Sequence, residues 1–118
     1  MLEILPLQSK DGHINAAKSV DTDHIQDSLA YAALDNERVC ALCQFKITEY
    51  GGEILSLDVI RDYDNKSVLT TLCMAVLAFI ELCGEEYAYF SAVCKDCDLV
   101  SAIGFHNDEN GRLVLKLR

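Results

Sequence analysis

Apolar residues alternate with other residues through the middle of the chain. Residues 38–48 carry an apolar side chain at every second position, a period that is typical of a strand with one buried face. Residues 53–61 are rich in Ile, Leu and Val and predict a second strand, and residues 31–34 predict a third. Short turns at 35–37 and at the glycine pair 51–52 separate these strands, so the pattern predicts an antiparallel meander.

A long apolar segment follows the meander. Residues 66–83 are apolar on almost every side, which predicts a helix buried against a sheet. Gly84 is placed to end this helix. The step from the meander through the helix to a strand at 87–93 requires a crossover, so we predict an α/β (α+β) domain with a mixed, mostly antiparallel sheet. The other expected elements are an edge strand at 1–7, a turn at 9–12, a weakly helical stretch after it, a helix at 24–29, a short helix at 96–103, a loop at 106–111 and a strand at 112–116.

Length and charge narrow the class of protein. The 118 residues suffice for one core, so residues 1–118 are expected to form a single domain. The net charge of −9 repels phosphate backbones and argues against a nucleic-acid partner, while it weakly favours a cationic substrate such as an amine. Residues 1–6 do not resemble a signal peptide, and the apolar run 68–83 is too short to span a bilayer comfortably. We therefore expect a cytoplasmic protein without a membrane partner.

The junction between the third meander strand and the long helix carries a motif. Val59, Tyr63, Val68 and Leu72 fall in phase, without a gap, with the pattern V-x-P-x-Y-R-G-x-G-I-G-x-x-L-L. Downstream, residues 103–105 read Ile-Gly-Phe and match a common L-G-F ending of a short helix. In these motifs and in its element order the chain resembles the GNAT superfamily of acetyltransferases over about residues 53–105. The resemblance implies transfer of an acetyl group from acetyl-CoA to an amine.

The same resemblance implies a cofactor site, but with altered residues. In the family, amides at the helix N-terminus and nearby glycines hold the pyrophosphate of acetyl-CoA. Here Asp64 stands where the family carries Arg or Gln, and Ser67 and Leu69 stand where it carries small residues. Asp64 is equally explained as a cap of a buried helix. The implied cofactor-binding residues are the backbone of Val59, Ile60 and Arg61, together with Lys66, Ser67 and Val68.

Two carboxylates are candidate general bases. The resemblance places Glu53 at the position of a base that histone acetyltransferases carry early in this strand, and Asp58 is a second candidate closer to the cofactor junction. Both also fit exposed strand carboxylates without a catalytic role. Val100 stands where many members carry a tyrosine acid, and it has no proton to donate. The chain is therefore expected to be an altered acetyltransferase or a non-catalytic GNAT-like binding or assembly module.

Cysteines and histidines supply the remaining chemistry. Cys40 and Cys43 form one C-x-x-C pair and Cys94 and Cys97 another, so a four-cysteine zinc site is a minor alternative to free, reduced cysteines. A thiol role for the second pair is also open, because it lies at a strand-to-helix junction. The histidines, His13, His24 and His106, have no evident partner in the sequence.

The expected partners follow from the resemblance to acetyltransferases. The acceptor would be a small-molecule amine or a peptide amine. The sequence does not identify it, because the short N-terminal region carries no recognisable acceptor motif. The sheet edges expected at both ends of the fold permit a homodimer.

Overall fold

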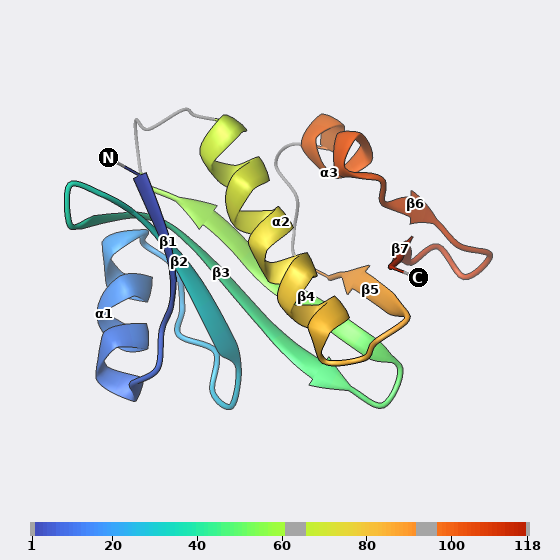
Figure 1. Cartoon of the computed structure of the whole chain (residues 1–118), viewed down its shortest axis with the longest axis horizontal. Coiled ribbons are helices and arrows are strands. Elements are labelled where there is room, and N and C mark those ends of the chain that lie inside the picture. Colours follow the sequence, from blue (N-terminus) through green and yellow to red (C-terminus); the bar gives the residue numbers. More distant parts are fainter. Residues whose placement is uncertain (1, 61–65, 92–96, 118) are drawn as a thin grey trace.

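A single sheet organises the chain. The computed structural model describes residues 2–60, 66–91 and 97–117 and shows seven strands in the order β1-β2-β3-β4-β5-β7-β6 (Figure 1). Neighbouring strands are antiparallel except β4 and β5, which are parallel. The predicted mixed, mostly antiparallel α/β fold is confirmed. The strands are β1 (Leu2–Pro6), β2 (Leu29–Asp35), β3 (Arg38–Thr48), β4 (Gly51–Val59), β5 (Tyr87–Phe90), β6 (His106–Asn107) and β7 (Leu113–Lys116).

The meander forms as its alternation predicts, but one turn lies elsewhere. Asn36 and Glu37 link β2 to β3 with φ angles of 51° and 69°, the positive values that a tight two-residue hairpin requires. Glu49 and Tyr50, not the glycine pair, link β3 to β4. The turn predicted at residues 51–52 is therefore wrong, and both glycines belong to β4.

The two glycines permit close packing. A Cβ atom on Gly51, whose φ is 148°, would collide with the carbonyl oxygen of Tyr87 on the neighbouring β5. A Cβ on Gly52 would lie 2.5 Å from the side chain of Ile80 in the long helix. Small residues are needed here because a strand approaches on one side and a helix on the other.

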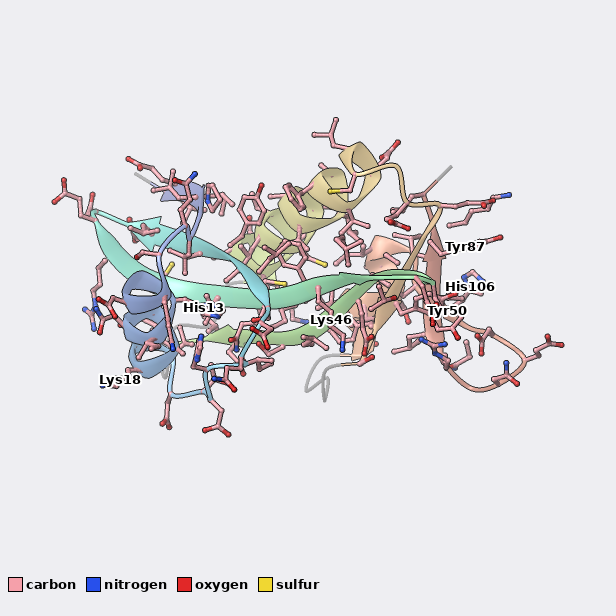
Figure 2. The ribbon with its side chains drawn as sticks, turned by 90° about the horizontal axis from the view of Figure 1, so that it is seen from below. His13, Lys18, Lys46, Tyr50, Tyr87 and His106 are labelled. Carbon is pink, nitrogen blue, oxygen red and sulfur yellow. The ribbon has the colours of Figure 1, made fainter. Side chains whose placement is uncertain are left out.

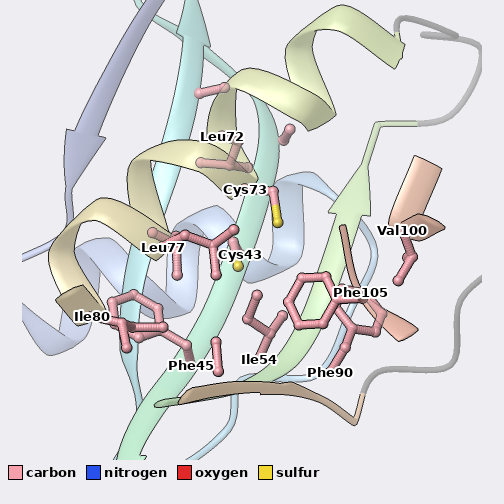
Figure 3. Close-up of a cluster of buried hydrophobic side chains, with 14 of the residues drawn as sticks. Cys43, Phe45, Ile54, Leu72, Cys73, Leu77, Ile80, Phe90, Val100 and Phe105 are labelled. Atoms are coloured by element: carbon pink, nitrogen blue, oxygen red, sulfur yellow. The ribbon is translucent and has the colours of Figure 1, made fainter. Parts of the chain in front are cut away.

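The long helix α2 (Lys66–Leu82) covers one face of the sheet (Figure 1). Its buried side chains meet Phe45 of β3 and Ile54 of β4 in the main core (Figure 3). The short helix α3 (Cys97–Ile103) packs beside α2. The rings of Phe90 and Phe105 contact each other edge-on, with centroids 5.6 Å apart. The helix predicted at 66–83 is confirmed except for its last residue. The buried residues of α2 are Val68, Leu72, Cys73, Val76, Leu77 and Ile80.

The opposite face of the sheet is covered by a smaller helix, and two sequence-based predictions for this region are wrong. Helix α1 (Lys10–Ser19) begins inside the predicted turn, because the hydroxyl of Ser9 accepts a hydrogen bond from the Gly12 amide at 3.0 Å and caps the first turn. No helix forms at 24–29, where a loop follows Asp21 at a φ of 55°. The prediction of a helix in that segment is wrong.

Smaller differences concern element ends. The strand predicted at 31–34 extends over Leu29–Asp35, and the one predicted at 87–93 ends at Phe90. A two-residue strand, β6, forms inside the segment predicted as a loop. Residues 61–65 and 92–96 lie outside the described residues, and with them the predicted ends of two strands and the first residue of the short helix.

The Gly52–Ile80 contact gives a stability prediction. Replacing Gly52 with Ala should lower the free energy of unfolding by about 1–3 kcal/mol, because the added methyl overlaps a side chain in a packed core. Urea unfolding measures this loss. In a double-mutant cycle, Ile80→Ala should relieve part of the Gly52→Ala cost, so that the two losses sum to more than the loss in the double variant. Strict additivity would show that the contact does not constrain the helix.

Candidate functional site

A gap in strand pairing defines the candidate site. Strand β4 pairs with β5 only from Gly52 to Ile54, and the Ser91 amide donates the last hydrogen bond to the Ile54 carbonyl at 2.9 Å. Within the described ranges, the second half of β4 pairs only with β3. Figure 1 shows β4 running past the end of β5 toward the first turn of α2. We call the side of β4 that faces away from β3, from Ile54 to the first turn of α2, the slot; residues 92–96, which follow β5, lie outside the described part of the chain.

A β-bulge lies where the slot begins. Gln44 pairs with Ser56 and Phe45 with Ile54, so Leu55 is an extra residue in β4. Beyond it, the Ile60 amide donates to the Cys40 carbonyl in β3 at 2.8 Å. Because backbone groups alternate in direction along an antiparallel strand, those of Leu57 and Val59 face away from β3 and into the slot.

The bulge also determines which side chains of β4 lie on each face of the sheet. Leu57 and Val59 pack toward α2. Glu53, Ser56 and Asp58 pair with β3 residues on the opposite face of the sheet. Both candidate bases predicted from the sequence therefore lie on one face of one strand, but about 15 Å apart along it.

Glu53 lies at the Ile54 end of the slot. Its Oε1 accepts a hydrogen bond of 2.8 Å from the Ser91 hydroxyl, and its side chain is half-buried. This contact joins β4 to the residue that follows β5, at the last point where the two strands are paired. A carboxylate is thus held at the end of the described β4–β5 pairing.

Asp58 lies in the second half of β4 and is paired with Leu42, a residue of the core under α1. Its Oδ2 is buried and has no hydrogen-bond partner within the described part of the chain. A buried carboxylate oxygen without a partner is costly, so such atoms are uncommon in native proteins and frequently mark a functional position. The interpretation of Asp58 as an exposed strand carboxylate is wrong.

Of the residues predicted to hold the cofactor, those that the structure describes lie at the end of β4 and in the first turn of α2. Lys66 and Ser67 are exposed in the first turn of α2, whereas the Val68 side chain is 2 % exposed and belongs to the core. Only the backbone of Val68 could meet a ligand. The Ile60 amide already donates its hydrogen bond to β3, and Arg61 lies outside the described residues. Leu57, whose backbone faces the slot, was not among the predicted residues.

Val100 and three of the described cysteines, Cys40, Cys43 and Cys73, are buried in the core. Val100 is 2 % exposed and packs in the core. Burial raises the pKa of the Cys43 thiol well above its usual value, with Cys73 and Asp58 adding to the effect, and raises that of Cys73 to about 12. Cys83, in contrast, is exposed. No group of three or more metal-ligating side chains occurs in the described residues, and Cys94 and the Cys97 side chain lie outside them.

A buried polar cluster adjoins the same face, and the sequence did not reveal it. Gln44 of β3 is fully buried, and its Nε2 donates to Ser56 Oγ at 2.8 Å and to the Asp23 carbonyl at 2.9 Å. Its Oε1 accepts from the Ile25 amide at 2.9 Å and lies 2.7 Å from His13 Nε2. All its partners except Ser56 are on α1 or on the loop after it, so Gln44 fixes this loop against the sheet.

The backbone partners of Gln44 determine the state of His13. A backbone amide can only donate and a carbonyl can only accept, so the orientation of the Gln44 amide is fixed. Neutral His13 must therefore donate from Nε2 and keep its lone pair on Nδ1. Burial lowers the pKa of His13, against the opposing effect of the Gln44 hydrogen bond, and the nearby His24 lowers it further. Both imidazoles, 4.4 Å apart between ring centroids, line a pocket of about 330 Å³ beside α1.

Comparison with known proteins identifies the fold. No family model and no curated protein sequence matches the chain. Among solved structures, it is similar to the Escherichia coli protein YhhK bound to coenzyme A, with 22% identity, a TM-score of 0.71 and coverage of 98% of both chains. It is also similar to the ribosomal-protein-S18-alanine N-acetyltransferase of Escherichia coli (15% identity, TM-score 0.73, covering 97% of this chain and 89% of that one). A third is a GNAT family acetyltransferase from Elizabethkingia anophelis with acetyl-CoA bound (14% identity, TM-score 0.71, covering 98% of both).

These similarities confirm the fold that the sequence motifs predicted: the chain is a GNAT-fold protein. They extend over nearly its whole length, including the N-terminal region where the motifs give no signal. None of the described helices has the length and apolarity needed to cross a membrane.

The His13 environment predicts a pH-dependent stability. The unfolded chain binds a proton near the ordinary histidine pKa of about 6.5, whereas folded His13 resists protonation until a lower pH. The free energy of unfolding should therefore fall as the pH drops from about 7.5 to about 5.5. Urea unfolding across this window should show a shallower fall for His13→Asn. Equal slopes for the wild type and His13→Asn would refute the assignment.

Proposed function

We propose that the chain binds an acyl-CoA in the slot between β4 and β5 and transfers its acyl group to an amine. The observation that carries the proposal is that the described β4–β5 pairing ends at Ile54 while the backbone groups of Leu57 and Val59 face away from β3, which would leave a path for a ligand from Glu53 to the first turn of α2. The GNAT fold of the similar proteins, two of which hold CoA or acetyl-CoA, supports it.

The residues around the slot fit an extended anionic ligand. The backbone groups of Leu57 and Val59 face the slot and would pair with an amide-containing arm as a neighbouring strand would. At the α2 end, Lys66 and the dipole of the 17-residue helix α2 favour negative charge, and the described first turn contains no acidic residue. When bound, the cofactor supplies a thioester, whose thiolate is a good leaving group.

Glu53 is the better of the two candidate bases. It lies within the described pairing of β4 with β5, far along β4 from the first turn of α2, and Ser91 holds one carboxylate oxygen in place. Its task would be to take a proton from the amine, directly or through water, as the new C–N bond forms and the C–S bond breaks. Asp58 lies about 15 Å away along β4, beside the path of the arm rather than at its end.

Val100 is buried and has no proton to donate, so this position supplies no acid to the leaving thiolate. A thiolate can leave unprotonated, so this position does not prevent transfer. It does favour a second candidate function, a GNAT-like module that binds acyl-CoA or a partner without turnover. Leu69 is half-buried against the core at a position where the family carries a small residue, which also favours the non-catalytic module.

The acceptor and the assembly belong to the same proposal. The acceptor would be a small-molecule or peptide amine approaching Glu53 from the face opposite α2. A homodimer through a sheet edge, as predicted from the sequence, would use β1 or β6, the strands at the two edges of the described sheet.

Charge reversal at the α2 end of the slot tests cofactor binding. Wild-type protein should show a higher melting temperature with acetyl-CoA, because a ligand that binds only the folded state stabilises it. Lys66→Glu should raise the Kd about tenfold, since it replaces an attractive charge by a repulsive one near the ligand phosphates. Lys18→Glu, at the far end of α1, should bind as the wild type does. A wild-type protein with no melting shift at millimolar acetyl-CoA would overturn the proposal.

Removing the charge of Glu53 separates catalysis from binding. Glu53→Gln should leave acetyl-CoA affinity unchanged and lower kcat about 10²–10⁴-fold, the usual contribution of a general base. Release of CoA, measured by chromatography with a panel of amines, gives the rate. Binding of acetyl-CoA without amine-dependent release in the wild type would favour the non-catalytic module. Equal loss of binding and rate in the variant would show that Glu53 holds the ligand instead.

A further inference from the structure

One row of side chains crosses the sheet from β3 to β6. Lys46 pairs with Glu53, Glu53 with Tyr89, Tyr89 with Val114, and Val114 with His106. Directly paired residues lie on the same face of a sheet, so the five side chains form one continuous row. The candidate base is thus the second member of a row that spans five strands.

This row lies on the face opposite α2. Ile54, Ala88 and Phe90, which flank Glu53 and Tyr89 along their strands, point into the core under α2. Side chains alternate along a strand, so Glu53 and Tyr89 must point the other way. The small core under α1 contains no residue of β5, β6 or β7. Figure 2 shows α1 toward one end of this face and Lys46, Tyr50 and His106 farther along it.

Cations gather on the row although the chain is acidic. The Arg112 guanidinium lies 4.1 Å from the centroid of the Tyr89 ring, and Lys46 is exposed directly opposite Glu53. Lys116 follows Val114 by two residues and therefore shares its face. Lys46 is thus paired with Glu53 across the sheet, Arg112 lies on the adjacent Tyr89 and Lys116 lies farther along the same face, in a chain with only ten Lys and Arg against 19 Asp and Glu.

This charge pattern selects among amines. A simple ammonium ion would be repelled by Lys46 and Arg112, although the same repulsion would help a bound amine to lose its proton. An acceptor that also carries an anion would satisfy the cations and still place its amine at Glu53. Building on the proposed function, we infer that the acceptor is an amine bearing a carboxylate or a comparable anionic group, held by Lys46 and Arg112.

Two sources would supply this chemistry: a free acidic amino acid, or the N-terminus of a peptide whose following residues are acidic. Both place an anion near a primary amine. The row is open along its length, so a peptide could follow it from Lys46 toward His106, whereas a free amino acid would meet only the cations nearest Glu53. The two sources therefore differ in how strongly Lys116 contributes.

The test compares matched acceptors on the full chain. Free glutamate is compared with glutamine and lysine, and a peptide beginning Ala-Glu-Glu with peptides beginning Ala-Gln-Gln and Ala-Lys-Lys. Calorimetry measures the binding of each to the protein without cofactor and with CoA, and chromatography measures acetyl transfer. The variants are Lys46→Gln, Arg112→Gln and Lys116→Gln, with Lys18→Gln on α1 as the matched control.

The expected result is a preference of tenfold or more for the acidic acceptor, with Lys46→Gln and Arg112→Gln each weakening its binding about three- to tenfold. Neutral acceptors should be insensitive to these variants, and Lys18→Gln should change nothing. A peptide source is indicated if Lys116→Gln also weakens binding, and a free amino acid if it does not.

Equal or better binding of the neutral or basic acceptors would overturn the inference, as would a preference that survives Lys46→Gln and Arg112→Gln. Transfer to such acceptors would leave the proposed function intact. Conversely, cation-dependent binding of the acidic acceptor to a protein that fails to bind acetyl-CoA would uphold the surface and refute the transferase.

Discussion

The short pairing of β4 with β5 is the constraint on which the candidate site depends. Three residues of β4 pair with β5 in the described sheet, and the bulge at Leu55 then sets which backbone groups of the remaining strand face away from β3. Gly51 and Gly52 make the paired part close: a larger residue at either position would push β5 or α2 outward. The first residues of β4 thus pack between β5 and α2. Near the other end of β4, the backbone groups of Leu57 and Val59 face away from β3.

The fold could be predicted where a pattern is local and strong. The alternation in 38–48 and the all-round apolar character of 66–82 correspond to β3 and α2 because each buries the face that the pattern marks. The prediction for the N-terminal region is wrong for a physical reason. Ser9 and Gly12 suit a turn and a capped helix equally well, and α1 is short, polar and held by contacts with β3 that are distant in sequence.

The site was only partly predictable for the same reason. Glu53 could be proposed because the family resemblance places a base there, and Asp58 and Lys66 because of their charge near the junction of β4 and α2. The structure puts Glu53 and Asp58 on one face of β4 and Lys66 in the first turn of α2. The link between His13 and Gln44 joins residues 31 positions apart, and no local pattern distinguishes Gln44 from an ordinary polar strand residue. The bulge that decides which β4 backbone groups face the slot depends on the register with β3, which the sequence does not show.

Charge shows most clearly why overall composition misleads about the ligand. A net charge of −9 favours cationic substrates only if the field of the whole chain acts at the site. At physiological ionic strength, however, exposed charges are largely screened beyond about 8 Å. A ligand at Glu53 would therefore respond mainly to Lys46, Arg112 and their neighbours, and a ligand at α2 mainly to Lys66. The cations near Glu53 favour an anion, and Lys66 does so at the first turn of α2 against Asp64 two residues earlier in the sequence, while the acidic remainder of the surface contributes solubility rather than specificity.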